Sequence, residues 1–597
     1  MSGCFVSTYY VASKLGLPIE LYSPFNIFVW NLDIGDDYPE TLNIGMGIVI
    51  FGVIFSIIFS YLIGVLRSHK KSESNTFGSA KWMTDKELKK SNLVAREGVF
   101  LGKKNGSYLR HDGPEHVIAF APTRSGKGVG LVIPTLLSWK GSVLVHDIKG
   151  ENWQITSGWR SQFSHCIYFN PTSKLSAKFN PLYEVRKGDN EIRDVQNIAD
   201  ILVDPDGAAD KRDHWSKTGH ALLVATILHI LYAEEDKTLS GVANFLSDPR
   251  RSIRETFDAM MKTNHLGDTV HPVVASSVRE MLNKSDNELS GVLSTTMSFL
   301  GLYRDPIVAS ATSDSDFRVA DLMNCENPLS LYLVVPPSDL SRTKPLIRLI
   351  LNQVGRLLTE KEITSKESYK HRLLMMIDEF PTLGRLDFFE SSLAYLAGYG
   401  VKCYLIAQSL NQIDKFYGRE NAILDNCHTR VAFSSNDDRT SRRISDLLGQ
   451  KTEVRQVVNH SGNKMQASLN HISVSSQESA RALLTPGEIG TLPSTDSLIF
   501  QAGSPPVYAE KITYYNDPNF EKRLLEAPSL DSESYEDVPQ KTKEIVWLNG
   551  DFVRQAELVT EEEYSEEDEI IEDIEGNEEE EFTHSEHKKS ISEGLIL

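Results

Sequence analysis

The chain has 597 residues, enough for several domains of ordinary size, and 40% of them are hydrophobic, so a large packed core is available. The formal net charge is −20, but residues 1–528 carry only −2 of it and the segment from Ser529 to the C-terminus carries −18. No long polybasic segment marks a nucleic-acid-binding surface, and the five scattered cysteines lack the spacing of zinc sites or disulfide frameworks, as is typical of free thiols in a reducing compartment.

The first predicted element is a membrane-spanning helix over residues 44–66. This run is uncharged and apolar, and 23 residues at about 1.5 Å each suffice to cross about 30 Å of hydrocarbon. A basic cluster at 67–71 follows it and several acidic residues precede it, so the positive-inside bias predicts residues 1–43 outside and the bulk of the chain in the cytoplasm. Residues 1–17 are apolar in part and are either the end of a first transmembrane helix that begins outside this sequence or an interfacial helix.

After a polar linker at 67–76, alternating apolar runs and turns predict an α/β domain in two parts, 77–182 and 326–520. The predicted strands are 117–121, 142–146, 329–335, 373–377, 402–407, 430–434 and 498–501. Residues 183–325 are predicted to form an all-α insertion, with helices at 194–202, 218–233, 275–282 and 289–302. Residues 452–480 are polar and predict a loop or a β-rich excursion, and 529–597 predict an acidic disordered tail that either recruits basic secretion signals or only solubilises the chain.

A phosphate-binding signature follows the strand at 117–121. The segment 121–128 reads APTRSGKG and matches the P-loop pattern GxxxxGK[ST], except that Ala121 replaces the first Gly and Gly128 replaces the hydroxyl residue. Such a loop directs backbone N–H groups and a helix N-terminus at phosphate, and Lys127 is expected to neutralise the β and γ phosphates of ATP. A Mg²⁺ ligand is then expected from water, Ser125 or Thr123. The predicted nucleotide-binding residues are Pro122, Thr123, Arg124, Ser125, Gly126, Lys127, Gly128 and Val129.

Two later strand ends supply acidic and amide groups. The apolar run 373–377 ends in Asp378 and Glu379, at the edge where parallel sheets bind ligands. We expect Asp378 to hold Mg²⁺ through water, and Glu379 to orient or deprotonate the attacking water of an ATPase. Gln408, after the run 402–407, is a candidate sensor of the γ phosphate. Lys149 and Glu151, after the strand at 142–146, are either substrate or subunit contacts or a charged turn.

In this order the motifs resemble those of the type IV secretion coupling proteins, also called TraG-type conjugative DNA-transfer ATPases. The resemblance spans about residues 77–515 and rests on the segments 78–82 (GSAKW), 121–130, 147–151 (DIKGE), 179–182 (FNPL), 336–337 (PP), 378–384 (DEFPTLG), 408–412 (QSLNQ) and 484–489 (LTPGEI). It implies a RecA-like P-loop ATPase domain with an inserted all-α domain and a membrane anchor, assembled as a homo-hexamer at the bacterial inner membrane. The implied partners are the channel proteins, and secreted protein effectors or single-stranded DNA nucleoprotein as cargo. The near-neutral body slightly favours protein cargo, since DNA affinity rests on phosphate neutralisation.

The sequence departs from the family pattern in two respects. Members usually have two transmembrane helices, and only one is evident. Some members also place a trans-acting Arg soon after the Asp-Glu pair, where residues 394–401 contain none, so the candidates are Arg430, Arg442 and Arg443. Trp215, at the start of a predicted helix, is more typical of a core residue than of a base-stacking one.

Two alternative functions were weighed against this interpretation. A DNA translocase of the FtsK kind would carry more membrane helices and a DNA-reading module at its C-terminus, where this chain ends in a Glu-rich tail. A membrane receptor that binds nucleotide without turnover would not need Lys127, Asp378, Glu379 and Gln408 together.

Overall fold

The computed structural model describes residues 2–17, 23–69, 75–205, 207, 213–360, 369–461 and 471–530. The predicted disordered tail lies outside the described residues from position 531 onward, as do residues 70–74 of the predicted linker. The chain forms two units, one of residues 1–78 and 452–480 and the other of residues 79–451 and 481–597.

The N-terminal part of the first unit contains one helix that suits a membrane. Its helices are α1 (Ser2–Leu15), α2 (Asn26–Asp33) and α3 (Pro39–His69). Within the described residues, only α3 is long and apolar enough to cross a membrane, over Pro39–Val65. Phe51, Phe55 and Phe59 stack along its exposed side. The helix begins before the predicted apolar run because Pro39 suits the first turn of a helix.

The short helix α1 packs antiparallel against the N-terminal half of α3. The Ser7 hydroxyl donates to the Gly45 carbonyl at 2.6 Å, and a Cβ added at Gly52 would lie 3.0 Å from the Gly3 Cα atom. Glycines at a helix contact let two backbones approach closely, as in membrane helix pairs. At about 1.5 Å per residue α1 is about 21 Å long, shorter than the hydrocarbon layer.

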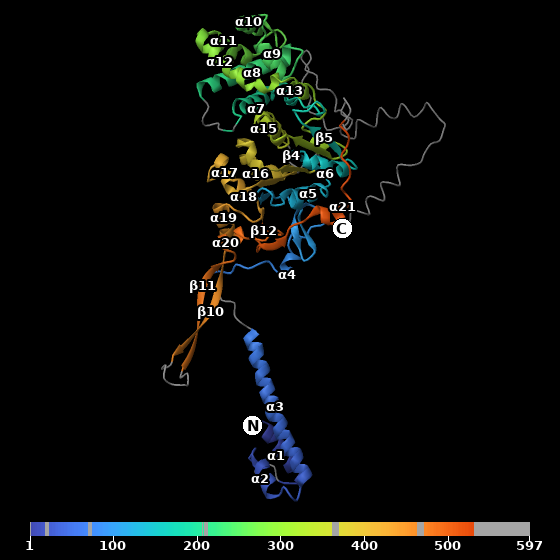
Figure 1. The fold of residues 1–597 in the computed structure, drawn as a ribbon, viewed down its shortest axis with the longest axis vertical. Helices are drawn as coiled ribbons and strands as arrows, with labels where there is room; N and C mark the ends of the chain where they lie inside the picture. Colours follow the sequence, from blue (N-terminus) through green and yellow to red (C-terminus); the bar gives the residue numbers. More distant parts are fainter. Residues whose placement is uncertain are drawn as a thin grey trace, which may run out of the picture. The chain divides into compact units, whose positions relative to one another are not determined.

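The second unit is built on an eleven-stranded sheet with the order β2-β1-β13-β12-β9-β3-β8-β7-β4-β6-β5 (Figure 1). Its strands are β1 (Val99–Lys104), β2 (Ser107–His111), β3 (Val117–Phe120), β4 (Ser142–Asp147), β5 (His165–Phe169), β6 (Leu329–Val334), β7 (Leu373–Ile377), β8 (Val401–Ala407), β9 (Thr429–Ala432), β12 (Asp496–Gln501) and β13 (Val507–Glu510). The strands from β9 to β5 are parallel, and β12, β13, β1 and β2 extend the sheet antiparallel. A separate sheet, nearly all of which belongs to the first unit, pairs β10 (Gln450–Ser461) with β11 (His471–Ala482), which confirms the β-rich excursion.

The parallel strands are buried on both faces, which explains their continuous apolar sequences. In β7, for example, Leu373 and Met375 belong to one hydrophobic cluster and Leu374 and Met376 to the cluster on the opposite face. Each strand predicted from such a run is present. The prediction missed β1, β2, β5 and β13, because their short sequences mix charged or polar residues with the apolar ones. The mixed α/β class is confirmed.

Helices surround this sheet and also form a region of their own between β5 and β6. The helices near the sheet are α4 (Asp85–Leu88), α5 (Ile133–Leu136), α6 (Glu151–Arg160), α15 (Leu340–Leu357), α16 (Asp387–Leu396), α17 (Leu410–Tyr417), α18 (Ile423–Asn426), α19 (Asp438–Leu448), α20 (Pro486–Gly490) and α21 (Pro518–Glu521). The helical region contains α7 (Glu191–Val203), α8 (His214–Ala233), α9 (Leu239–Leu246), α10 (Ile253–Lys262), α11 (Pro272–Leu282), α12 (Asp286–Phe299), α13 (Pro306–Ala311) and α14 (Asp321–Asn324). Figure 1 shows α8 to α12 gathered at the end of this unit away from β12, with α15 between them and the sheet.

The helical region is organised around α8, which packs against α7, α11 and α12 and is therefore apolar nearly all round. Asp213 caps its start by accepting from the Ser216 backbone N–H at 2.8 Å. The expectation that Trp215 is a core residue is wrong: the side chain lies at the first turn, across Gly291 of α12, and remains 38% exposed.

Candidate nucleotide-binding site

The phosphate-binding loop connects β3 to a π-helical turn, Gly128–Val132, that leads into α5. Gly126 has φ +87°, and Arg124 adopts φ +60°, which non-glycine residues rarely do. A Cβ placed on Gly126 or Gly128 would meet nothing within 4 Å, so the backbone of the loop is open on that side. These features suit a loop whose N–H groups face an anion.

The two acidic residues leave β7 through a strained turn. Glu379 has φ +52°, and Thr382 holds its carbonyl oxygen with both the backbone N–H, at 2.8 Å, and the hydroxyl, at 2.7 Å. The Glu379 N–H donates to the Asp378 carboxylate at 2.9 Å. His146, at the end of β4, contacts the Asp378 carbonyl at 2.9 Å through Nδ1. Strain held by several contacts is typical of residues placed for function.

The order of the strands brings the predicted catalytic groups together. β8 lies between β3 and β7, so the carboxyl ends of the three parallel strands are adjacent. Lys127 Nζ lies 2.9 Å from Asp378 Oδ1 and also pairs with Glu379. Gln408 Nε2 donates to both carboxylate oxygens of Glu379, at 3.1 and 3.0 Å. Lys127, Asp378, Glu379 and Gln408 thus form one polar cluster.

The loop also offers a hydroxyl in place of the one that Gly128 lacks. The Ser125 Oγ atom is buried and has no hydrogen-bond partner among the described residues, whereas Thr123 is exposed. A buried hydroxyl without a partner is costly unless a ligand completes it. Ser125 and Asp378 carry oxygen atoms of the type that Mg²⁺ prefers as ligands.

Two residues of this neighbourhood were missed in the sequence. Lys511, just after β13, donates from Nζ to the Ser125 carbonyl at 3.0 Å and lies 3.8 Å from the centroid of the Phe433 ring. Burial lowers the pKa of Lys511 to about 8. The other is His146, whose pKa is lowered by burial. Lys511 follows a strand that was not predicted. His146 is the last residue of the strand predicted at 142–146, where one histidine gave no sign of a contact with Asp378.

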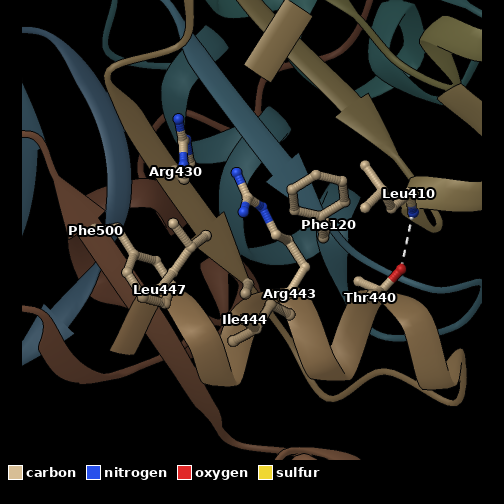
Figure 2. Close-up of a pocket in the computed structure, with 9 residues that line it drawn as sticks. Phe120, Leu410, Arg430, Thr440, Arg443, Ile444, Leu447 and Phe500 are labelled. Carbon is tan, nitrogen blue, oxygen red and sulfur yellow. Dashed lines mark hydrogen bonds between the residues drawn. The ribbon is translucent and has the colours of Figure 1, made fainter. Parts of the chain in front are cut away.

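The three candidate trans-acting arginines differ in their contacts. Arg430 donates to the carbonyls of Leu424 and Cys427, at 2.8 and 3.1 Å, and Arg442 pairs with Asp438 at 2.7 Å. Arg443 is exposed and makes no hydrogen bond or ion pair within the part of the chain that the structure describes. Figure 2 shows Arg443 reaching from α19 into a pocket that Arg430 of β9 and Phe120 of β3 also line.

In the turn after β4, Asp147 caps the start of the helix α6. Asp147 is buried and accepts from the backbone N–H groups of Lys149 and Trp153, at 3.3 and 3.0 Å, at the start of α6. Burial raises the pKa of Asp147 to about 6. Lys149 and Glu151 are exposed, so their predicted contact with substrate or a neighbouring subunit stays a prediction.

Comparison with known proteins gives relatives along nearly the whole chain. The profile of the family described as "Type IV secretory system Conjugative DNA transfer" matches residues 73–537. A "Conjugal transfer protein TraG" of Escherichia coli is 39% identical over 578 residues, covering 88% of this chain and 90% of that protein. A "Protein VirD4" of Rhizobium radiobacter is 28% identical, covering 88% of this chain and 76% of that protein.

Solved structures of a conjugative coupling protein, TrwB, share the fold. The unbound form lacking its N-terminal segment has a TM-score of 0.56 at 19% identity and covers 74% of this chain and 96% of that one. The TrwB complex with ADP and Mg²⁺ has a TM-score of 0.54 and covers 73% and 94%. Because the family profile matches residues 73–537 and the TraG relative is 39% identical over nearly the whole of both proteins, the chain belongs to the type IV secretory system conjugative DNA transfer family, the coupling proteins of type IV secretion.

Proposed function

We propose that this protein is a membrane-anchored ATPase that receives substrates and delivers them to a type IV secretion channel. The observation that carries the proposal is the convergence of Lys127, Asp378, Glu379 and Gln408 at one edge of the sheet. A structural cofactor site would need the cation but not a carboxylate held in a strained turn beside an amide. The TraG and VirD4 relatives support the setting, and the TrwB complexes with nucleotide support ATP as the ligand.

In the proposed reaction the loop residues Pro122 to Val129 bind the phosphates of ATP. Lys127 exchanges its pairing with the two carboxylates for the β and γ phosphates, which frees Glu379. Glu379 then orients a water molecule in line with the γ phosphorus and takes its proton as the bond to the ADP oxygen breaks. Gln408, hydrogen-bonded to Glu379, reports the presence of the γ phosphate to α17, which begins two residues later.

Mg²⁺ fits the oxygen ligands of this edge. Ser125 contributes the hydroxyl that Gly128 does not have, and Asp378 contributes a carboxylate through water. The ion supplies charge neutralisation on the β and γ phosphate oxygens when it is bound.

In a ring of subunits, an arginine of one chain completes the nucleotide site of the next. We infer that the chain assembles as a homo-hexamer and that Arg443 acts in trans, because it is the candidate whose guanidinium makes no hydrogen bond or ion pair within the described residues of its own chain. Arg430 and Arg442 already have backbone or carboxylate partners and rank below it.

The same proposal places α3 in the bacterial inner membrane with the ATPase unit in the cytoplasm. The apolar helix supports the anchor, and the charge asymmetry around it supports the orientation. The channel proteins are the proposed partners. The cargo is single-stranded DNA nucleoprotein, protein effectors or both, since the family is described by DNA transfer while the body of this chain is close to neutral.

Hydrolysis by the full chain in detergent, with Mg²⁺ and with or without single-stranded DNA, tests this function. Lys127→Ala should abolish turnover and nucleotide binding, whereas Lys140→Ala should not, because Lys140 forms only an exposed pair with Glu97. Unchanged hydrolysis in Lys127→Ala would refute the site. Nucleotide binding without turnover at all protein concentrations would favour the receptor, and turnover that only duplex DNA stimulates would favour a translocase of the FtsK kind.

A further inference from the structure

The segment 380–386, which follows the catalytic acids, contacts several separate parts of the ATPase unit. It opens with a 3₁₀ turn, Phe380–Leu383, and is tied to the acid turn because Thr382 donates twice to the Glu379 carbonyl. Gly384, with φ +73°, then redirects the chain toward α16. A change in the backbone of Glu379 therefore displaces this segment.

Arg348 joins the segment to the helical region. This side chain of α15 is 2% exposed, and its Nη1 donates to the carbonyls of Leu383 and Arg385, at 2.9 and 2.7 Å. Its Nη2 donates to the carbonyl of Asp204, the residue that ends α7, at 3.3 Å. A planar guanidinium can hold carbonyls from two separate elements at once, which an ammonium on a flexible stem does less well.

A second contact lies beside the first. Gly207 has φ +77°, and a Cβ added there would overlap the carbonyl of Arg385, so the two backbones touch. Gly207, three residues beyond Asp204, is therefore seated directly on the segment after the acids. Only glycine fits this position, for reasons of both space and conformation.

The helix α17, which follows Gln408, also contacts this segment. Tyr417, at the end of α17, donates to the Gly384 carbonyl at 3.3 Å and accepts from the Leu386 N–H at 3.2 Å. Its ring stacks on Phe380, with centroids 5.5 Å apart. Since α17 begins two residues after Gln408, both Glu379 and Gln408 are connected to residues 380–386.

We infer that residues 380–386, clamped by Arg348, transmit the nucleotide state of the site to the helical region through the C-terminal end of α7, at Asp204, and through Gly207. The inference rests on the proposed nucleotide site. The clamp is a positioning device: Arg348 touches no reacting group, and it makes the position of α7 depend on the conformation of the Glu379 turn. If bound nucleotide changes the affinity of the helical region for a partner by some factor, then by linkage the bound partner changes the affinity for nucleotide by that same factor.

Hydrogen exchange of the full chain in detergent tests the transmission, with Mg²⁺ and a non-hydrolysable ATP analogue as the probe. In the wild type the analogue should change exchange in peptides from α7 and the start of α8 by about threefold, a size typical of local opening equilibria. A fluorescent analogue measures nucleotide affinity separately on the same samples.

Arg348→Lys should bind nucleotide within about twofold of the wild type but lose the exchange response in α7 and α8, since population shifts need contacts that differ between states. Tyr417→Phe removes one hydroxyl without changing volume and should weaken the response in part. Arg342→Lys is the matched control on the same helix, because Arg342 pairs with Asp305 and Asp339 at the exposed side.

The outcomes separate the two proposals. A wild type that fails to bind the analogue refutes the nucleotide site and the inference together. A wild type that binds it without any change in α7 and α8 refutes the inference alone, as does an Arg348→Lys protein that folds and responds like the wild type. Equal loss of response in Arg342→Lys would also overturn it, because the effect would then belong to the whole contact between α15 and the helical region.

Discussion

The proposed ATPase edge of the sheet and the buried histidines of the helical region are both polar clusters inside one unit, but their hydrogen bonding differs. At the proposed ATPase edge, two non-glycine residues have positive φ, and Ser125 Oγ and His146 Nε2 are buried without hydrogen-bond partners among the described residues. In the helical region, each of His229, His265 and His271 is held by contacts at ring nitrogens.

The histidine contacts define one proton arrangement. Backbone N–H groups donate to Nδ1 of His265, at 3.2 Å, and to Nδ1 of His271, also at 3.2 Å, so each ring carries its proton on Nε2. His265 can then donate to His229, at 2.9 Å, and His271 to Glu191, at 3.0 Å. Glu191 also accepts from the Tyr232 hydroxyl at 2.6 Å.

The difference indicates what each cluster is for. Unfilled hydrogen-bonding capacity and strained backbone are expected where a ligand completes the structure. A closed network instead specifies one packing of α7, α8 and the segment before α11, and it costs stability only when a proton is added. Substitutions in the two clusters should therefore differ in kind: those at the edge of the sheet change turnover, and those in the histidine network change stability.

Substitution of Glu379 should have the largest effect on turnover. Glu379→Gln keeps the size and the polar contacts but removes the base, so hydrolysis should fall about 10²- to 10⁴-fold while nucleotide still binds. Steady-state turnover and nucleotide affinity, measured on the full chain, separate the two steps. Glu326→Gln, at an exposed position far from the site, is the control. Retention of most activity in Glu379→Gln would show that another group activates the water.

Gln408→Ala should come next. Loss of the amide that holds both carboxylate oxygens of Glu379 should lower turnover about 10²-fold, the size typical of one positioned hydrogen-bond donor, with little change in nucleotide affinity. Gln408→Glu should be worse than Ala, because it places a second negative charge beside Glu379. An equal effect of both substitutions would indicate that the amide only fills space.

The site residues that the sequence predicted all belong to short sequence patterns, such as a polar residue at the end of an apolar run. Asp378 and Glu379 end a run of buried residues, and Gln408 ends another, so their meeting at one edge follows from the rules for parallel sheets. Lys511 reaches Ser125 from a position 386 residues away, next to a strand whose mixed sequence gave no signal. Arg348 lies inside an amphipathic helix, where a buried guanidinium cannot be told from an exposed one by sequence. The contacts that polar side chains make with residues far away in the sequence could therefore not be predicted.

Lys511 should show a smaller effect that depends on pH. It is near the loop and its pKa is lowered to about 8, so it loses its charge as the pH rises through 8. A bound phosphate favours the charged form, and nucleotide affinity in the wild type should therefore fall above pH 8. Lys511→Met should bind nucleotide about threefold to tenfold more weakly at pH 7 and lack the inflection, because one partly buried cation contributes about 1 kcal/mol.

Lys511→Arg provides the matched control for this effect. It stays charged throughout the range, so its nucleotide affinity should not fall between pH 7 and 9. The same inflection in Lys511→Arg as in the wild type would assign it to another group.

The smallest effect should be the acid sensitivity of the histidine network. Burial lowers the pKa of His229 to about 3 and that of His265 to about 4, with Arg251 and the neighbouring histidines acting in the same direction, whereas the unfolded chain titrates near 6.5. Between these values the unfolded state binds more protons than the folded state, so the free energy of unfolding is highest above pH 6.5 and falls as the pH decreases toward 4. Each histidine contributes at most about 1.4 kcal/mol per pH unit.

Thermal melts at pH 7.5 and pH 5 measure this dependence. The wild type should lose more melting temperature than His265→Gln on acidification. About 1 kcal/mol corresponds to about 2–4 °C in a domain of 150–250 residues and to less in a larger unit such as this one. His265→Gln lowers stability at both pH values. The quantity to compare between the proteins is therefore the change in melting temperature from pH 7.5 to pH 5. His214→Gln, at an exposed site on α8, should keep the wild-type dependence. If His265→Gln keeps it too, the network is not the acid-sensitive element, and the contrast between a closed structural cluster and an open catalytic one loses its thermodynamic support.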